Sequence, residues 1–304
     1  MDEGAARRVW QFAEPIHAVT YFAPETRAAT DALGLRGGWM SYFGCRAAPL
    51  GRVNALVVTA TFCNFHPTMV ARAVPEVWDR AAPGQLLDAR LGAAGEALER
   101  ILGDEVRGPG LRRTSELAGR AADACDTVGR ALAAANAGIA RSSVPHLALW
   151  QAVTTLREHR GDGHVATLVG HEITPCEALV LQGATGRSPV DGLRAHRGWS
   201  EAEWSEATDA LRTRGWLADD GAISRSGVEA RDRVEAETDH LAVAPFRTLG
   251  EDATDDLIAG LRPLAAWVMS ARAVPADNLM GLPWPPAQPG QPGQPGRAAP
   301  TGLP

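Results

Sequence analysis

Lysine is missing from this chain of 304 residues, so all 30 of its basic residues are arginine. An all-arginine composition fits a GC-rich coding sequence as well as any demand for fixed cations, and it assigns no function. Acidic residues outnumber the arginines, and the formal net charge of -6 gives no general attraction for nucleic acids or anionic membranes. Long apolar runs are also missing, since none approaches the roughly 18 residues that a membrane-spanning helix needs.

Cysteine is scarce and widely spaced, with no Cys-x-x-Cys pair among Cys45, Cys63, Cys125 and Cys176. This spacing predicts no zinc ribbon and favours buried, reduced thiols. The first residues contain no apolar segment typical of a signal peptide. We therefore expect a cytoplasmic protein with no membrane partner.

Apolar residues are abundant, at 45% of the chain, and the length suggests two domains with real cores. Almost no stretch alternates apolar and polar residues with a period of two, which predicts a multi-helical domain over 1–185. Its first helix, 5–22, is expected to be interrupted at Pro15. The other helices are predicted over 25–34, 38–47, 54–63, 67–79, 84–103, one or two within 111–138, and 145–160.

The pattern changes after residue 186. A short helix, a glycine turn, a second helix, a short hairpin and a long helix follow in the order of a winged helix. Ser200 and Glu203 form a capping box, and Asp219-Asp220-Gly221 makes a tight turn between two short apolar pairs. The predicted elements are helices over 189–196, 201–214 and 224–241, a wing over 216–223, and a closing helix over 251–272.

The predicted fold class is therefore mainly α. A multi-helical N-terminal domain (1–185) is followed by a winged-helix domain with a short two-strand wing and a closing C-terminal helix (186–275). Residues 284–304 repeat Gln-Pro-Gly and hold few apolar residues to bury, which predicts a disordered tail.

The helix order of 187–241 is similar to that of MarR-like regulators. The whole chain resembles an actinobacterial family of proteins that carry this C-terminal helix-turn-helix module. Three stretches carry the likeness over most of 5–285: residues 14–22 (Glu-Pro-Ile-His-Ala-Val-Thr-Tyr-Phe), residues 44–51 (Gly-Cys-Arg-Ala-Ala-Pro-Leu-Gly) and residues 157–164. The resemblance implies a fold and no particular activity.

The predicted recognition helix, 201–214, is acidic where it begins. Its first nine positions contain Glu201, Glu203, Glu206 and Asp209. Carboxylates suit the positive end of a helix dipole, but they repel the phosphates of a duplex. The tip of the predicted wing, 219–221, is acidic as well. These charges argue against DNA binding and favour a packing or dimerisation unit, or one wall of a pocket.

Residues 157–171 combine three histidines, two arginines, an aspartate and three glycines. Glycine inside a helix costs about 1 kcal/mol relative to alanine. A helix break, close packing against a neighbour or close approach of a ligand would each account for Gly161 and Gly163.

Arg157, Arg160 and His164 share one face of a helix, because they are spaced i, i+3 and i+7. Two guanidiniums and an imidazole on one stripe make a receptor for a carboxylate or phosphate, while a solvated, ion-paired helix face is the alternative. Asp162 is placed to orient the imidazole of His164 for acid–base catalysis, and His159 would serve equally well. The catalytic candidates are therefore His164, Asp162 and His159.

Further candidates lie nearer the N-terminus. Five residues resemble the wall of an aromatic pocket, with core packing as the alternative: Tyr21, Trp39, Tyr42, Phe43 and Arg46. His17 follows Glu14 with the Glu-x-x-His spacing of di-metal helical bundles, and His66 lies at a helix junction where a capping role is the alternative. The ligand-binding candidates are Arg157, Arg160, Arg46, His17, Tyr21 and His66, and no metal ligand is assigned.

The sequence favours a small-molecule-binding protein, with a pocket between the helical part and residues 157–164 for an anionic or polar aromatic molecule. Whether it is an enzyme, and with which cofactor, stays open, as does a homodimer. One alternative is a ligand-responsive, MarR-like regulator that binds DNA as a dimer. Another is a metalloprotein that uses His17, His66 and His164.

Overall fold

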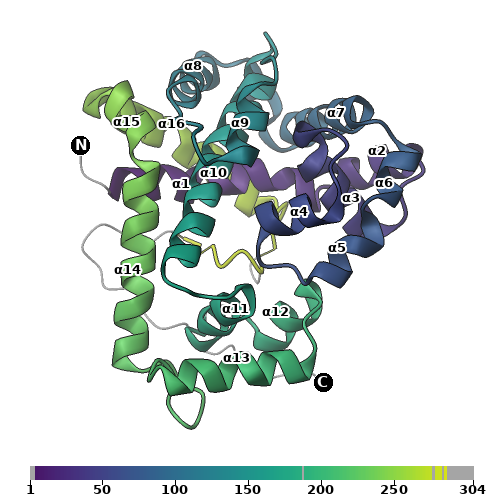
Figure 1. Cartoon of the computed structure of the whole chain (residues 1–304). Helices are drawn as coiled ribbons and strands as arrows, with labels where there is room; N and C mark the ends of the chain where they lie inside the picture. The colour runs from purple at the N-terminus through teal and green to yellow at the C-terminus, as the bar shows by residue number, and fades with distance from the viewer. Residues whose placement is uncertain (1–3, 187, 276–277, 283, 286–304) are drawn as a thin grey trace, which may run out of the picture.

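The computed structural model describes residues 4–186, 188–275, 278–282 and 284–285. These residues form helices joined by loops (Figure 1). The helices are α1 (Gly4–Phe22), α2 (Pro24–Ala32), α3 (Gly37–Ala47), η1 (Ala48–Leu50), α4 (Ala55–Phe62), α5 (Pro67–Ala73), α6 (Glu76–Arg80), α7 (Pro83–Leu102), η2 (Gly103–Arg107), α8 (Pro109–Asp123), α9 (Ala131–Ala137), α10 (Pro145–Gly170), α11 (Pro175–Ala184), α12 (Val190–Arg197), α13 (Glu201–Thr213), α14 (Arg225–Ala242), α15 (Ala244–Leu249) and α16 (Glu251–Ser270).

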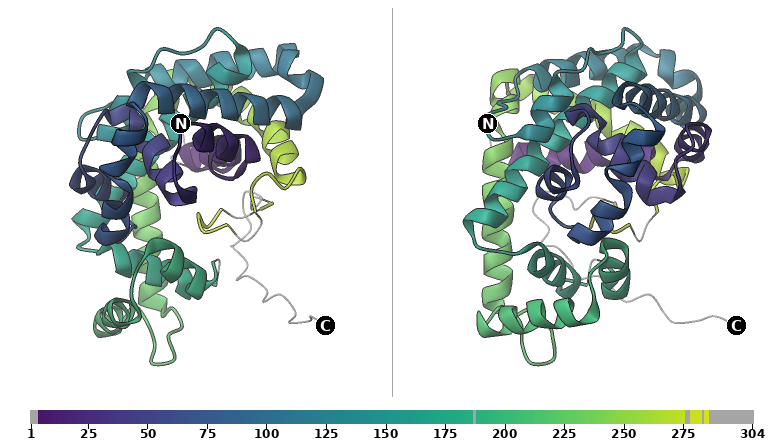
Figure 2. Two further views of the ribbon diagram at one scale, coloured as in Figure 1. Left: turned by 90° about the vertical axis from the view of Figure 1, so that its right-hand side faces the viewer. Right: turned by 45° about the vertical axis from the view of Figure 1, so that its right-hand side comes forward.

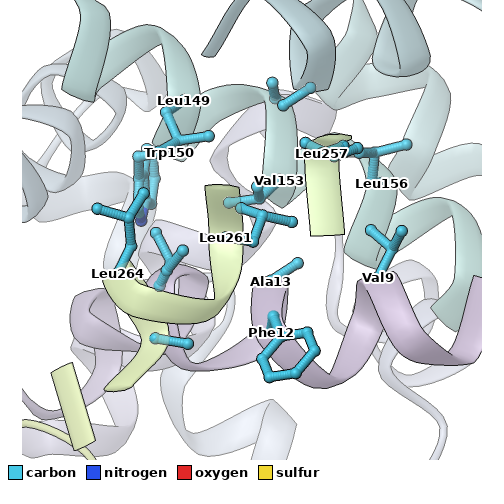
Figure 3. Close-up of a cluster of buried hydrophobic side chains, with 14 of the residues drawn as sticks. Val9, Phe12, Ala13, Leu149, Trp150, Val153, Leu156, Leu257, Leu261 and Leu264 are labelled. Carbon is cyan, nitrogen blue, oxygen red and sulfur yellow. The ribbon is translucent and has the colours of Figure 1, made fainter. Parts of the chain in front are cut away.

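Helices α1, α10 and α16 build the centre of the main hydrophobic core (Figure 3). Phe12 from α1, Trp150 from α10 and Leu261 from α16 are all buried in it. A second core forms among α3 to α7 around Phe43 and Trp78. We call these helices, together with α2, α8, α9 and α15, the helical body.

Helix α1 is continuous through Pro15, so the predicted interruption there is wrong. Proline removes one backbone hydrogen bond, but tertiary packing holds this helix. Val9, Ile16 and Val19 on either side of Pro15 are 1% exposed or less.

Helix α10 also runs farther than predicted, through both glycines to Gly170. Close packing explains Gly163: a Cβ there would lie 2.6 Å from Nη1 of Arg130 and 3.3 Å from Cβ of Leu241 in α14. Gly161 has only ordinary contacts, since its nearest neighbour would be Oε2 of Glu158 at 3.5 Å. The two glycines therefore do not break the helix.

Helices α11, α12 and α13 form a separate cluster, which we call the helix-turn-helix unit. Gly198, with a φ of 79°, makes the turn between α12 and α13, and Ser200 caps α13 with the predicted Glu203 box. Leu181 and Leu211 pack together in the small core of this unit. Because α11 packs with α13, the predicted domain division at residue 185 falls at the end of a helix of this unit. The division itself stays a prediction.

Figure 2 shows the unit at one end of the molecule, with α14 spanning the distance back to the helical body. Helix α14 packs along α10, and the chain closes with α15 and α16 on α1 and α8.

The predicted two-strand wing is wrong, and with it the winged-helix fold class. Within the described ranges no strand forms, and the hairpin between α13 and α14 contains one isolated antiparallel bridge, Leu217 to Ile223. Its arms are short because Ser224 already caps α14. Ala218 and Ala222 face solvent, so no further apolar pair is available to extend a ladder. The prediction of a mainly α protein of many helices agrees with the structure.

Three other features bear on the sequence expectations. Cys45 and Cys176 are buried free thiols, and Cys63 and Cys125 are half-buried free thiols. Among the described helices, none combines the length and apolar character required to cross a bilayer. The predicted tail falls on residues 286–304, outside the described residues, apart from its first two positions.

We predict opposite effects of alanine at the two glycines of α10. Gly163→Ala displaces the Arg130 guanidinium, which donates to the carbonyl oxygens of His159 and Leu241 at 2.6 Å each. We expect the free energy of unfolding to fall by about 1–2 kcal/mol, despite the better helix propensity of alanine. Gly161→Ala is the matched control and gains up to about 1 kcal/mol. Urea denaturation measures both, and an equal gain in the two variants would contradict close packing at Gly163.

Candidate ligand pocket

A cavity of about 810 Å³ lies between the helical body and the helix-turn-helix unit. Its walls come from α1, α3, the end of α4 and the loop after it, α10, α11, α12, α14 and residues 278–281. The volume falls in the range of small-molecule sites, roughly 300–1,000 Å³.

Aromatic side chains cover the side of the pocket formed by α1, α3 and the loop after α4. Tyr42 is the centre of this wall: its ring centroid lies 5.0 Å from that of Tyr21 and 5.3 Å from that of Phe65. Trp39 packs against Phe65 at 5.6 Å. Phe43, which the sequence also suggested for this wall, is fully buried in the second core behind it.

A buried carboxylate, Glu158 of α10, binds two arginines at the back of the pocket. Arg46 of α3 donates to both of its oxygens at 2.9 Å, and Arg157 donates to Oε2 at 2.7 Å. Burial by itself raises the pKa of Glu158, but the charges of Arg157 and Arg46 outweigh it and hold the pKa well below its ordinary value. Glu158 is therefore an anion locked between two cations.

The two arginines of this group hold other pocket residues in place. Arg46 donates to the hydroxyl oxygen of Tyr42 at 3.1 Å. Arg157 lies 3.5 Å from the carboxylate of Glu14, which also accepts a hydrogen bond from the Trp10 indole at 3.0 Å. The charges of Arg46, Arg157, Glu14 and Glu158 balance.

A second balanced group lies at the α14 side. Arg160 donates to Asp239 at 2.7 Å and approaches Glu235 at 3.4 Å. Arg7 of α1 binds the same two carboxylates, at 2.7 Å and 3.2 Å respectively. Arg160 also lies over the Trp10 ring, 4.9 Å from its centroid. Both predicted anion receptors, Arg157 and Arg160, thus border the pocket with carboxylates already bound.

The structure does not bring Asp162 to the imidazole of His164. Oδ2 of Asp162 accepts from the backbone N–H groups of Leu132 and Ala133, at 3.0 and 2.9 Å, and so caps α9. His164 borders the pocket and its Nδ1 shares a hydrogen bond with Thr238 of α14 at 3.0 Å. Burial raises the pKa of Asp162 and lowers that of His164.

The other predicted histidines lie away from the pocket surface. His159 is 1% exposed, borders a separate cavity of about 10 Å³, and has a buried Nε2 without a hydrogen-bond partner. His17 is buried between Thr154 and Tyr21, at 2.9 and 2.8 Å. His66 caps α5 and binds Glu203 of α13 at 2.8 Å. No group of three or more potential metal ligands gathers within the described part of the chain, so the three histidines of the metal hypothesis do not converge there.

Sequence reasoning missed Arg197, the last residue of α12. Its guanidinium borders the pocket over the Phe65 ring, 4.6 Å from the centroid, and its Nε is buried without a hydrogen-bond partner. Burial lowers its pKa, Tyr42 acts against this, and the neighbouring charges of Arg46 and Arg157 act in the same direction as burial. In sequence, an arginine directly before a helix-ending glycine reads as an ordinary C-terminal residue, so no signal pointed to it.

One family of known proteins matches the chain. A family model described as a helix-turn-helix family matches residues 6–275, which include the helical body and the helix-turn-helix unit. The curated proteins and the solved structures that were compared give no match. The match supports the helix-turn-helix resemblance and leaves its MarR-like and actinobacterial parts as expectations.

We predict that Glu158→Gln strongly destabilises the protein. The substitution leaves Arg46 and Arg157 without their shared anion in a buried site, and breaking such a group costs about 3–5 kcal/mol. Glu237→Gln, which removes the partner of His171 at the surface, is the matched control and costs less than about 1 kcal/mol. Comparable losses in the two variants, measured by chemical denaturation at pH 7, would show that the buried group contributes nothing special.

We also predict that His159 makes the protein less stable in mild acid. Burial is the main cause that lowers its pKa from 6.5 to about 4. Between those pH values the unfolded chain binds a proton that the folded protein does not, so stability is lost as the pH falls from 6.5 towards 4. The loss reaches at most about 3 kcal/mol. In His159→Leu the plot of unfolding free energy against pH should flatten over this range, and a plot parallel to that of the unmutated protein would refute the assignment.

Proposed function

The chain belongs to a helix-turn-helix family, and from this premise we propose that it is a ligand-responsive, DNA-binding regulator. The helical body binds a small molecule in the pocket, and the helix-turn-helix unit contacts operator DNA. Regulators of this kind bind paired half-sites as dimers, and we include a homodimer in the proposal.

The observation that carries the proposal is the shared wall of the pocket. Tyr42 and Arg157 belong to the helical body, whereas Gly192 and Arg197 belong to α12. A molecule that touches both parts binds best in one of their relative arrangements. Such a difference in affinity between two arrangements is what lets a ligand shift an equilibrium between them.

Residues 63–66 supply a route from the pocket to the DNA-binding part. Phe65 and Asn64 border the pocket. The backbone oxygen of Asn64 accepts from the Trp199 indole at 3.0 Å, in the turn before α13. The backbone N–H of His66 donates to the oxygen of Arg197 at 2.8 Å, and its ring binds Glu203. A ligand that moves this loop therefore moves the turn between α12 and α13.

Charge decides which end of the unit faces DNA. Glu201, Glu206 and Asp209 are exposed along the first part of α13 and repel phosphates. Arginines lie at the other end, near the hairpin, on either side of its tip with the exposed Asp219 and Asp220. Arg225 is 93% exposed at the start of α14, and Arg212 is partly exposed at the end of α13. We place the phosphate contacts there.

The exposed acids of α13 favour a second candidate. In this alternative the protein binds a small molecule, as an enzyme or as a carrier, and the helix-turn-helix unit only closes the pocket. The same pocket residues serve both candidates, so DNA binding is the property that separates them.

We predict a specific complex with the DNA upstream of the protein's own coding sequence in a gel shift at low salt. Raising the salt weakens it, because phosphate contacts release counterions. Arg225→Gln weakens binding to all sequences alike and lowers the salt slope by about one. Arg27→Gln on α2 is the matched control, since both arginines form exposed i, i+4 ion pairs, and it leaves binding unchanged.

Absence of a salt-sensitive complex with that DNA would overturn the regulator proposal and leave the second candidate. A complex that Arg225→Gln does not weaken would instead move the DNA-binding surface away from the hairpin end.

A further inference from the structure

The arginines of the pocket differ in how their charges are matched. Arg46 and Arg157 face Glu158 and Glu14, and Arg7 and Arg160 face Asp239 and Glu235. Each group holds two cations and two carboxylates. Arg231, on α14, has an interaction of its own. Each of the four arginines in the two groups therefore already faces a carboxylate, although the buried Nε of Arg160 has no hydrogen-bond partner in the described part of the chain.

Arg197 is different. Within the described ranges it forms no ion pair, and none of the charged groups that influence its pKa is a carboxylate. Its Nε is buried with no acceptor, and two other cations, Arg46 and Arg157, lie near enough to disfavour its charge. The side chain of Arg197 is half-buried with its Nε enclosed, and no carboxylate among the described residues matches its charge. Arginine meets that need best with a planar carboxylate, which its fork binds through two parallel hydrogen bonds.

The surroundings of Arg197 specify the rest of the ligand. The guanidinium stacks on Phe65, whose other neighbours are Trp39 and Tyr42. Rings at these separations leave edges and faces that bind a flat aromatic molecule. The hydroxyl oxygen of Tyr42 accepts from Arg46, and the other two rings of this wall, Phe65 and Trp39, are mainly apolar.

We propose that the pocket binds a flat aromatic molecule with a single carboxylate, and that Arg197 binds this carboxylate. The inference rests on the proposed sensing function for its biological meaning and identifies the chemical class of the ligand. It moves the anion-binding role from Arg157 and Arg160, which the sequence suggested, to a residue of the helix-turn-helix unit.

The position of Arg197 gives the contact a regulatory consequence. Arg197 is followed directly by Gly198, the residue that turns the chain between α12 and α13, and its backbone oxygen binds His66. A carboxylate held there contacts the unit itself, at the junction of its two helices.

Isothermal titration calorimetry with 2-naphthoate and its neutral analogue 2-naphthamide tests the inference without DNA. For the unmutated protein we expect naphthoate to bind at least tenfold more tightly than the amide. Arg197→Gln should weaken naphthoate binding roughly ten- to a hundredfold and leave amide binding unchanged. Arg197→Lys, which keeps the charge but not the fork, should lie between them. Arg194→Gln, on the same helix but outside the pocket, is the matched control and should bind as the unmutated protein does.

Equal affinity for naphthoate and naphthamide overturns the inference, as does an unchanged affinity of both Arg197 variants for naphthoate. Failure of both compounds to bind overturns the aromatic class. These outcomes are independent of the gel shift, so a protein that binds its operator but does not distinguish the two compounds keeps the proposed function and loses this inference.

Discussion

The buried interaction of Glu158 with Arg46 and Arg157 holds the pocket together. It joins α10 of the main core to α3 of the second core, and all three side chains are at most one-fifth exposed. Taking these charges out of water is costly, and only close, multiple hydrogen bonds offset that cost. The bidentate contact at 2.9 Å meets this condition. Because Arg46 also holds the Tyr42 hydroxyl, the same interaction sets the position of the aromatic wall.

The ion pairs of Arg7 and Arg160 with Asp239 and Glu235 hold α14 against the helical body, as the ion pair of Arg46 with Glu158 holds α3. Arg160 of α10 and Arg7 of α1 both bind Asp239, so that α14 is fastened to two helices of the body. Helix α14 in turn follows the hairpin after α13. The helix-turn-helix unit is therefore tied to the body by α14 at one side and by residues 63–66 at the other, with the pocket between them.

The features predicted correctly from the sequence are those determined by residues close together in the chain. The spacing of Arg157, Arg160 and His164 places them on one helix face, and in the structure all three border the pocket. The capping box of Ser200 and Glu203 formed as expected, because it involves only neighbouring residues. A stretch of sequence with its own capping and turn signals was sufficient to locate α12, α13 and α14.

The errors have long-range causes. Pro15 does not interrupt α1 because the core on both sides of it holds the helix, and Gly163 of α10 is required by its close contacts with Arg130 and α14. The capping role of Asp162 could not be predicted from its neighbours in sequence, because the N–H groups that it caps lie about 30 residues away in α9. The carboxylates that neutralise Arg160 come from α14, 75 and 79 residues away. All of these contacts together decide which arginine has no carboxylate partner. The role of Arg197 could therefore be recognised only in the folded structure.

In the regulator that we propose, the unmatched charge of Arg197 would also provide the energy for a switch. A half-buried guanidinium beside two other cations is unfavourable, and a bound anion would relieve this only while α12 stays against the body. Any arrangement that exposes Arg197 to water relieves it as well, without a ligand. On this proposal, the ligand would favour the closed arrangement over the open one. The free energy gained would be the difference between neutralising Arg197 with an anion and hydrating it. Coupling of about 1–3 kcal/mol is typical of allosteric proteins, which is of the size that one charge-assisted hydrogen-bonded pair supplies.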